Sequence, residues 1–164
     1  MDISYREKHA SLPALIMMVG IPGSGKSTWI SKNSVENTVV VSPDDIRREL
    51  SGNVSDQTQN AKVWFLVKER TSKALRDGKN VILDATNVAS KSRKRFLQGL
   101  PPHKLQAKRF EADPEESNRR IRKQIESGED RADVPHSAIL SMHEQFKNQS
   151  NPEQLQTQGF ELLD

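Results

Sequence analysis

A glycine-rich stretch with the sequence GIPGSGKST, at positions 20–28, has the residue types and spacing of a phosphate-binding loop. Its glycines let consecutive backbone N–H groups approach a bound phosphate, because side chains there would block the approach. In this pattern the lysine bridges the β- and γ-phosphates of a nucleotide, and the serine hydroxyl after it binds Mg²⁺. The sequence therefore predicts a nucleoside triphosphate site, with ATP and Mg²⁺ as the expected ligands. The residues expected at this site are Gly20, Pro22, Gly23, Ser24, Gly25, Lys26, Ser27 and Thr28.

A second group of candidate residues, Asp44 and Arg47, follows the β-branched run at 38–41. Asp44 is our candidate general base, because a carboxylate there could accept the proton of an attacking hydroxyl group. Arg47 lies one helical turn further on and could hold an acceptor phosphate by two hydrogen bonds. The alternative is an ordinary helix N-terminus with a surface ion pair, and that alternative already explains Asp45.

A third group follows the apolar run at 80–83 and consists of Asp84, Thr86 and Asn87. An acid at Asp84 could hold Mg²⁺ through water or orient an arginine of the site. Thr86 and Asn87 offer neutral hydrogen-bond donors to an acceptor phosphate or base. Asp and Asn are also ordinary residues of a strand-to-helix turn, so that structural role stays open.

Four arginines surround a polar, glycine-containing segment that could close over the triphosphate: Arg119, Arg120, Arg122 and Arg131. We expect one of them to reach the transferring γ-phosphoryl group from within the chain. Our choice for this catalytic role is Arg122, and we expect Arg119 and Arg131 to contact the nucleotide. A charged, solvated helix face is the alternative for such residues.

The remaining aromatic and basic residues give weaker signals. We expect Trp29, Trp64 and Phe65 in the hydrophobic core rather than as stacking platforms for bases. A predicted helix over 90–98 should carry four cations on its outer face: Lys91, Arg93, Lys94 and Arg95. Because this helix directly follows the Asp84 turn, we interpret its basic face as a nucleic-acid track, with a solvated surface as the alternative.

The elements that would position these groups alternate along the chain. Apolar or β-branched runs predict strands at 14–19, 38–41 and 80–83, with a more mixed strand at 104–111. Helical stretches separate them, so we expect an α/β fold with a parallel sheet of about four or five strands and helices on both faces. All three groups of candidate residues near these strands then fall at the carboxyl ends, where ligands bind in such sheets.

The rest of the chain is expected to belong to the same single domain, 1–164. We expect a flexible arm at 1–12, a lid at 119–134 and a polar tail at 148–164, which could end in a short edge strand at 160–163. The 25 Lys and Arg residues against 22 Asp and Glu residues give a net charge of +3, compatible with a polyanionic partner.

The absence of cysteine excludes disulfides and thiolate metal sites, and the four histidines show no ligand spacing. Since the longest apolar run is too short to span a membrane, we expect a soluble, cytoplasmic protein without membrane contact. A phage-encoded protein acting in a host cell would also fit.

Three motifs in order resemble the 5′-hydroxyl polynucleotide kinase family of P-loop phosphotransferases. They are the loop from Gly20 to Trp29, the sequence DDIR at 44–47 and the sequence DATN at 84–87, and the resemblance runs from about 14 to 147. It implies a stand-alone kinase domain of P-loop kinase type with a helical lid, using ATP and Mg²⁺.

The same resemblance assigns roles to individual residues. It implies Asp44 as the general base, Arg47 as the acceptor-phosphate arginine, and Asp84 and Thr86 as the acid and hydroxyl of the family's turn. The lid is longer here than the family pattern, so Arg119 or Arg131 could take the place of Arg122.

We therefore expect an enzyme that moves the γ-phosphoryl group of ATP to a nucleic-acid hydroxyl, at the 5′-OH end of DNA or RNA. One alternative acceptor is a 5-hydroxymethyl group on a modified base, such as 5-hydroxymethyluracil in phage DNA; another is a small metabolite. An alternative of another class is a regulatory NTPase switch with no acceptor. No obligate protein partner is evident, and the oligomeric state stays open.

Overall fold

A computed structural model describes residues 12–164, so most of the expected arm at 1–12 lies outside the described residues. All strand pairs are parallel and form a five-stranded sheet in the order β2–β3–β1–β4–β5. The expected α/β sheet is confirmed. The strands are β1 (Ala14–Val19), β2 (Thr38–Val41), β3 (Asn80–Leu83), β4 (Lys104–Arg109) and β5 (Glu161–Leu162).

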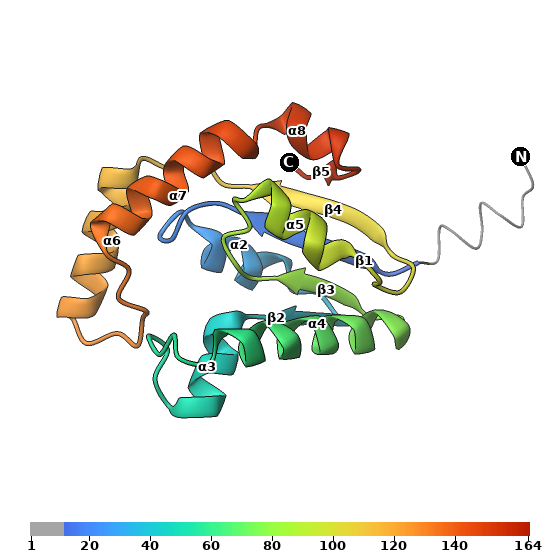
Figure 1. Ribbon diagram of the computed structural model, residues 1–164, viewed down its shortest axis with the longest axis horizontal. Helices are drawn as coiled ribbons and strands as arrows, with labels where there is room; N and C mark the ends of the chain where they lie inside the picture. Colours follow the sequence, from blue (N-terminus) through green and yellow to red (C-terminus); the bar gives the residue numbers. More distant parts are fainter. Residues whose placement is uncertain (1–11) are drawn as a thin grey trace, which may run out of the picture.

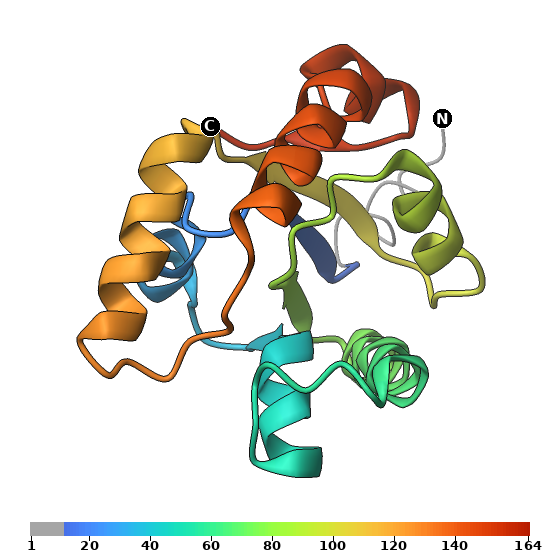
Figure 2. The same ribbon diagram turned by 60° about the vertical axis from the view of Figure 1, so that its left-hand side comes forward.

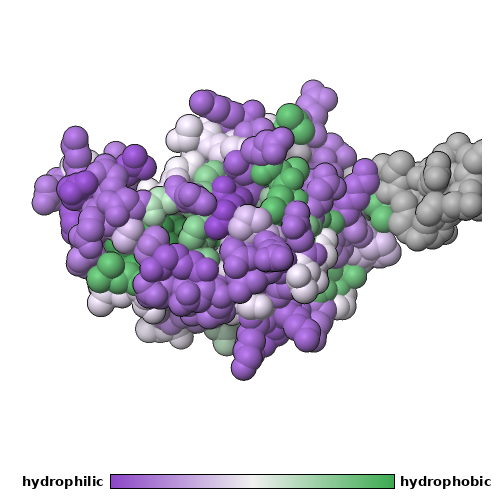
Figure 3. Space-filling model, turned by 90° about the horizontal axis from the view of Figure 1, so that it is seen from above, coloured by the Kyte–Doolittle hydropathy of each residue, from purple (hydrophilic) through white to green (hydrophobic). Residues whose placement is uncertain are grey.

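Helices α4 and α5 lie on one face of the sheet and α2 lies on the other (Figure 1). Within residues 12–164 no helix is long and apolar enough to cross a membrane. The face seen in Figure 3 is predominantly hydrophilic, with small hydrophobic areas between polar side chains. The helices are α2 (Lys26–Asn33), α3 (Pro43–Ser51), α4 (Asn60–Arg76), α5 (Ser90–Leu97), α6 (Pro114–Glu126), α7 (His136–Gln149) and α8 (Pro152–Thr157).

Strand β1 forms the centre of the core. It pairs with β3 through Met17 opposite Leu83 and with β4 through Met17 opposite Ala107. These three side chains are fully buried, as expected for a parallel strand covered on both faces. The register also aligns Val41 of β2 with Leu83 of β3, so the carboxyl ends of β1, β2 and β3 meet at one edge.

Side-chain caps determine where two of the helices begin. The Ser42 hydroxyl accepts a hydrogen bond from the Asp45 N–H at 3.3 Å, and α3 begins with Pro43. In the same way the Asp113 carboxylate accepts from the Glu116 N–H at 3.2 Å at the start of α6. Such caps satisfy N–H groups that have no partner within the helix. Because α3 starts at this cap, Asp44 lies in its first turn at the carboxyl end of the sheet.

The segment 148–164, expected to be a polar tail, is instead docked on the domain. It contains α8 and β5, and β5 pairs with β4 through Glu161 opposite Gln106. Leu155 and Phe160 are buried in the core. The removal of their apolar side chains from water stabilises the docked position of a segment that is otherwise rich in polar residues. The expected short strand at the end of the chain is confirmed.

The aromatic side chains depart from the sequence analysis. Trp29 is half-buried and packs edge-on against Phe110, with ring centroids 6.3 Å apart. Phe65, however, is 66% exposed and Trp64 is 38% exposed, so their placement in the core was wrong. The buried stripe of α4 is formed by Val63, Val67 and other residues at helical spacing, and Phe65 lies outside it.

Arg93 is the second departure, since it is only 1% exposed rather than part of the outer face of α5. Its guanidinium donates to the Asn87 carbonyl at 2.8 Å, the Ser150 hydroxyl at 2.7 Å and the Gln158 side chain at 2.8 Å, and also to the Gln149 carbonyl. Burial lowers the pKa of Arg93 to about 10, so the group stays charged at neutral pH. Arg93 therefore ties the C-terminal segment to the turn after β3.

We expect Arg93→Met to destabilise the fold by about 3 kcal/mol, because the buried carbonyls that it satisfies would lose their donors. Urea unfolding followed by circular dichroism measures the change. Lys91→Met, an exposed position on the same helix, serves as the matched control and should change stability by less than about 0.5 kcal/mol. Equal effects of the two substitutions would contradict a structural role for Arg93.

Candidate active site

A cavity of about 720 Å³ lies at the carboxyl ends of β1, β2 and β3. It brings together the phosphate-binding loop, the start of α3, the turn after β3 and one side of the lid. The candidate residues that line it are Pro22, Gly23, Ser24, Gly25, Lys26, Ser27, Thr28, Asp44, Arg47, Asp84, Thr86, Arg120 and Arg131.

The phosphate-binding loop has a shape that requires its glycines. Gly23 and Gly25 have φ angles of 76° and 98°, in the left-handed region that favours glycine. At Gly20 an added Cβ would lie 2.9 Å from Cβ of Phe110, so there is no room for a side chain. The loop leads directly into α2, whose first three residues, Lys26, Ser27 and Thr28, line the cavity. This backbone geometry fits the phosphates of a nucleotide.

Lys26 lies at the centre of the site. Its Nζ donates hydrogen bonds to the carbonyls of Gly20 at 3.0 Å and Ile21 at 2.7 Å. Burial lowers the pKa of Lys26 to about 8, with a further lowering by Arg131, while the negative charges of Asp84 and Asp44 act in the opposite direction. The ammonium group is thus held in a partly dehydrated position where an added anion would stabilise it.

Asp84 is the acidic residue with the strongest effect on the charge of Lys26. Burial raises the pKa of the Asp84 carboxyl; Lys26 opposes this rise, and the charge of Asp44 adds to it. Asp84 and Ser27 both line the cavity beside the phosphate-binding loop. A carboxylate and a hydroxyl are oxygen donors of the kind that Mg²⁺ prefers, so this pair fits a magnesium site.

Asp44 and Arg47, which also line the cavity, form a direct ion pair. Nη1 of Arg47 lies 2.7 Å from Oδ1 of Asp44, and the Asp44 side chain remains 48% exposed towards solvent and cavity. Nη2 of Arg47 donates to Oδ1 of Asn60 at 3.1 Å, while its Nε is buried without a partner among the described residues. Asn60, the first residue of α4, is a neighbour of the site that the sequence analysis did not identify.

Thr86 lines the cavity, but Asn87 has a different role. Asn87 adopts a φ of 50°, and its Nδ2 donates to the carbonyl of Met18 at 2.7 Å. Its own carbonyl accepts from Arg93. The amide therefore holds the turn after β3 against the end of β1. This is the role of a strand-to-helix turn residue, the alternative given for Asn87 in the sequence analysis.

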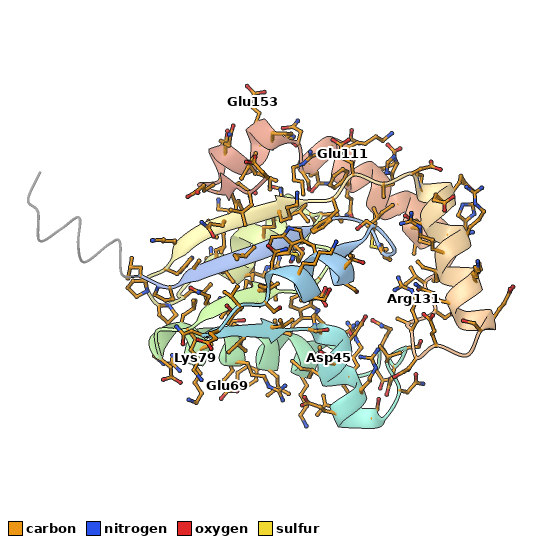
Figure 4. All side chains as sticks on the ribbon, turned by 180° about the vertical axis from the view of Figure 1, so that it is seen from behind. Asp45, Glu69, Lys79, Glu111, Arg131 and Glu153 are labelled. Carbon is orange, nitrogen blue, oxygen red and sulfur yellow. The ribbon has the colours of Figure 1, made fainter. Side chains whose placement is uncertain are left out.

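Among the lid arginines, Arg131 and Arg120 face the cavity. Arg131 extends from the loop after α6 towards the body of the domain (Figure 4), and its Nε has no hydrogen-bond partner among the described residues. Burial lowers the pKa of Arg131, and the charge of Asp44 opposes this shift. Nη1 of Arg120 lies 3.3 Å from the carbonyl of Gly23 in the phosphate-binding loop.

The other two arginines make contacts within the lid, and within residues 12–164 neither lines this cavity. Arg122 binds Asp133 at 2.5 Å and donates to the carbonyl of Val134, so it shapes the lid loop. Arg119 pairs with Glu116 on the surface of α6. Helical spacing could have separated Arg119 from Arg120, because Ser117 and Ile121 mark the buried side of α6, Arg120 follows Ser117 by three residues, and Arg119 lies on the opposite side.

The lid loop touches the wall that carries Asp44. Nε of Arg48 on α3 lies 2.7 Å from Oδ2 of Asp130, and its Nη2 donates to the Asp130 carbonyl at 3.0 Å. The N–H of Asp133 donates to the Ser55 hydroxyl at 3.1 Å. In Figure 2 this loop runs from α6 to α7 close to α3. These contacts place Arg131 over the cavity.

Comparisons with known proteins agree with this fold. The model of the AAA domain family matches residues 15–149. A chain in the Pnkp1/Rnl/Hen1 RNA repair complex is 27% identical with a TM-score of 0.71; the match covers 83% of the present chain and 44% of that chain. The present chain thus corresponds to less than half of that relative's length.

Two more distant structures share the fold alone. A candidate kinase from Chloroflexus aurantiacus is 19% identical with a TM-score of 0.64, and the match covers 80% of the present chain and 77% of the other. The Deinococcus radiodurans tunicamycin resistance protein is 17% identical with a TM-score of 0.57, with 93% and 86% covered. Because the family model spans most of the chain, the protein belongs to the AAA domain family, with the fold of a P-loop kinase.

Proposed function

We propose that this protein transfers the γ-phosphoryl group of ATP to the hydroxyl group at the 5′ end of a nucleic-acid strand. The observation that carries the proposal is the Asp44–Arg47 pair, which faces the phosphate-binding loop across one cavity. A base paired with an anion-binding arginine suits a phosphorylated acceptor, whereas hydrolysis by water needs no such clamp. The 27% identity to a chain in an RNA repair complex supports a nucleic-acid acceptor.

On the donor side, the backbone of residues 20–28 and Lys26 hold the triphosphate. Ser27 and Asp84 would hold Mg²⁺, which neutralises phosphate charge when bound. Arg131 is placed to stabilise the negative charge on the transferring group, because its guanidinium lines the cavity beside Asp44. We therefore assign to Arg131 the role that the sequence analysis gave to Arg122.

On the acceptor side, Asp44 takes the proton of the attacking hydroxyl group. At the same time the oxygen of that hydroxyl group forms a bond to the γ-phosphorus. The bond between the γ-phosphorus and the β–γ bridging oxygen breaks, and ADP leaves with that oxygen. Arg47 binds the first phosphate of the acceptor, and the Thr86 hydroxyl helps to orient it. Asn60 keeps Arg47 in place through its 3.1 Å hydrogen bond.

Transfer from γ-labelled ATP with Mg²⁺ tests the proposal directly. We expect label on 5′-hydroxyl DNA or RNA oligonucleotides and none on 5′-phosphorylated controls or simple sugars. Asp44→Asn should lower kcat by about 10²–10⁴-fold with little change in the Kd for ATP, because the base acts only on the acceptor. Asp45→Asn is the matched control, since Asp45 pairs with Arg48 at 2.7 Å outside the reacting groups.

Other results of this assay would overturn the proposed acceptor. Label on 5′-blocked DNA containing 5-hydroxymethyluracil would move the reaction to the base, and label on sugars alone would indicate a metabolite kinase. ATP hydrolysis unaffected by every acceptor would indicate a nucleotide switch. If Asp44→Asn weakened ATP binding as much as transfer, the assignment of Asp44 as base would be wrong.

The pKa of Lys26 predicts proton uptake on ATP binding. With a pKa of about 8 in the free protein, Lys26 is half-protonated near pH 8, and the phosphates of ATP favour its charged form. ATP affinity should therefore fall as the pH rises from about 8 to about 9.5. Calorimetric titration at pH 8 in buffers of different ionisation enthalpy should show uptake of about half a proton, unchanged in Lys32→Gln. Heats independent of the buffer would contradict this prediction.

The assignment of the lid arginine is tested by three substitutions. Arg131→Ala should lower kcat by about 10³-fold, because the transferring group loses its arginine. Arg119→Ala, which removes an exposed arginine paired with Glu116, should leave kcat nearly unchanged. Single-turnover transfer with saturating ATP measures each effect. A larger loss of kcat in Arg122→Ala than in Arg131→Ala would return the role to Arg122.

A further inference from the structure

Two large aromatic side chains on α4, Trp64 and Phe65, are exposed at the surface. Phe65 is 66% exposed and Trp64 is 38% exposed, although Trp64 also touches Phe96 of α5 edge-on, with ring centroids 6.3 Å apart. Exposed aromatic residues on one side of a surface helix often mark an interaction surface. Together with neighbouring cations they form what we call the aromatic–basic strip: Trp64, Phe65, Lys68, Lys91, Lys94 and Arg95.

We propose that the acceptor strand leaves the catalytic cavity along this aromatic–basic strip, with unpaired bases stacked on Phe65 and Trp64. The inference rests on the proposed function, because it takes a nucleic-acid strand as the acceptor. It adds the path of the strand and the requirement that the bases next to the reacting end are unpaired.

Contacts on its two sides show which way α4 presents these residues. Arg70 pairs with Glu49 of α3 at 2.6 Å, which marks one side of the helix. Lys68 marks the other side, since its Nζ donates to carbonyls at the end of α5 and lies 5.9 Å from the Phe96 ring centroid. At about 100° per residue, Trp64, Lys68 and Phe65 fall within an arc of about 100°. Trp64 therefore lies on the side of α4 next to α5, where it touches Phe96, and Phe65 lies further round the helix, towards solvent.

The strip begins beside the acceptor wall of the cavity. Arg47 is bonded to Asn60, the first residue of α4, at 3.1 Å. Phe65 follows five residues later, so it lies about 7.5 Å further along the helix axis. That rise corresponds to about two nucleotides of a stacked strand at about 3.4 Å each. Phe65 is also turned about 140° around the helix from Asn60, so the strand must follow the surface of α4 round to reach it. An acceptor whose first phosphate contacts Arg47 would bring its next bases to Trp64 and Phe65.

The charge of this surface suits a polyanion. Lys91, Lys94 and Arg95 are exposed on α5, while Arg93 is turned into the core. The segments 60–68 and 85–100 contain no acidic residue. The first acid along α4 is Glu69 (Figure 4), which lies one helical turn beyond Phe65 on the same outer side of the helix and so bounds the strip there. Cations without neighbouring acids bind phosphates by counterion release, and exposed aromatic rings stack on bases of any type.

The same features favour a single strand over a duplex. The flat faces of bases in a duplex are already stacked on their neighbours, so a side chain such as Phe65 has no free face to contact. In a single strand each base offers a π-face, and the phosphates can follow the cations of α5. The acceptor end is therefore expected to be single-stranded or overhanging.

Acceptor length provides the test. For a 5′-hydroxyl 12-mer, Phe65→Ala should raise KM about tenfold with kcat unchanged, because one stacking contact is lost. For a 5′-hydroxyl nucleoside 3′-phosphate, which carries the first phosphate but no following base, the same substitution should leave KM unchanged. Leu140→Ala, a partly exposed apolar residue on α7, is the matched control and should alter neither value.

The cations of α5 are tested by the salt dependence of kcat/KM for the 12-mer. Replacing Lys94 and Arg95 together by glutamine should reduce the slope of log kcat/KM against log salt concentration by about 1 to 2. Lys79→Gln, beyond the far end of α4, should leave the slope unchanged.

Direct binding of a labelled 12-mer without ATP separates this proposal from the proposed function. Weaker binding to Phe65→Ala than to the native protein would support the strip even if no label were transferred, and in that case only the proposed reaction would fail. Transfer to all 5′-hydroxyl acceptors with identical KM values in native and Phe65→Ala proteins would overturn the strip and leave the reaction intact. A preference for blunt duplex ends over single strands would also overturn it.

Discussion

Parallel pairing of the three central strands is the constraint on which the candidate site depends. Because β1 pairs with β3, and β3 with β2, in parallel register, their carboxyl ends lie at one edge of the sheet. The phosphate-binding loop, Asp44 and Asp84 follow these strands immediately, so groups far apart in the sequence share one cavity. A shift of one residue in either register would turn the buried side chains of β1 or β3 to the wrong face. Core packing and site geometry are therefore fixed together.

The charged groups at this edge of the sheet stabilise one another, because each has an oppositely charged neighbour. Lys26 is partly dehydrated in the phosphate-binding loop, and its charge is supported by Asp84 and Asp44. Asp44 in turn is paired with Arg47, and it also opposes the lowering of the Arg131 pKa. The cavity thus combines two cationic side chains, Lys26 and Arg131, with the carboxylates of Asp44 and Asp84. This arrangement is electrostatically suited to an anionic ligand.

Position in the fold, rather than residue type, decides what each arginine does. Arg93 is turned inward and holds the C-terminal segment to the turn after β3. Arg122 binds the lid loop that carries Arg131, and Arg131 reaches the cavity. Arg95, two positions from Arg93, is exposed on the opposite side of α5. Arginine side chains therefore have different roles in the core, in the lid, at the candidate site and on the surface.

The sequence by itself determined the parallel α/β fold, the order of its strands and helices along the chain, and the residues of the phosphate-binding loop. These features follow from local patterns, namely apolar runs, caps and glycine spacing, which need no knowledge of distant contacts. Only the tertiary structure decided that Arg93 is buried, that Asn87 supports a turn, that Phe65 is exposed and that Arg131 rather than Arg122 lines the cavity. Each of these outcomes depends on which neighbouring element covers a given side of a helix or turn. Long-range packing of this kind cannot be predicted from the spacing of residues in the local sequence. The docking of α8 and β5 against Arg93 and β4 is an example.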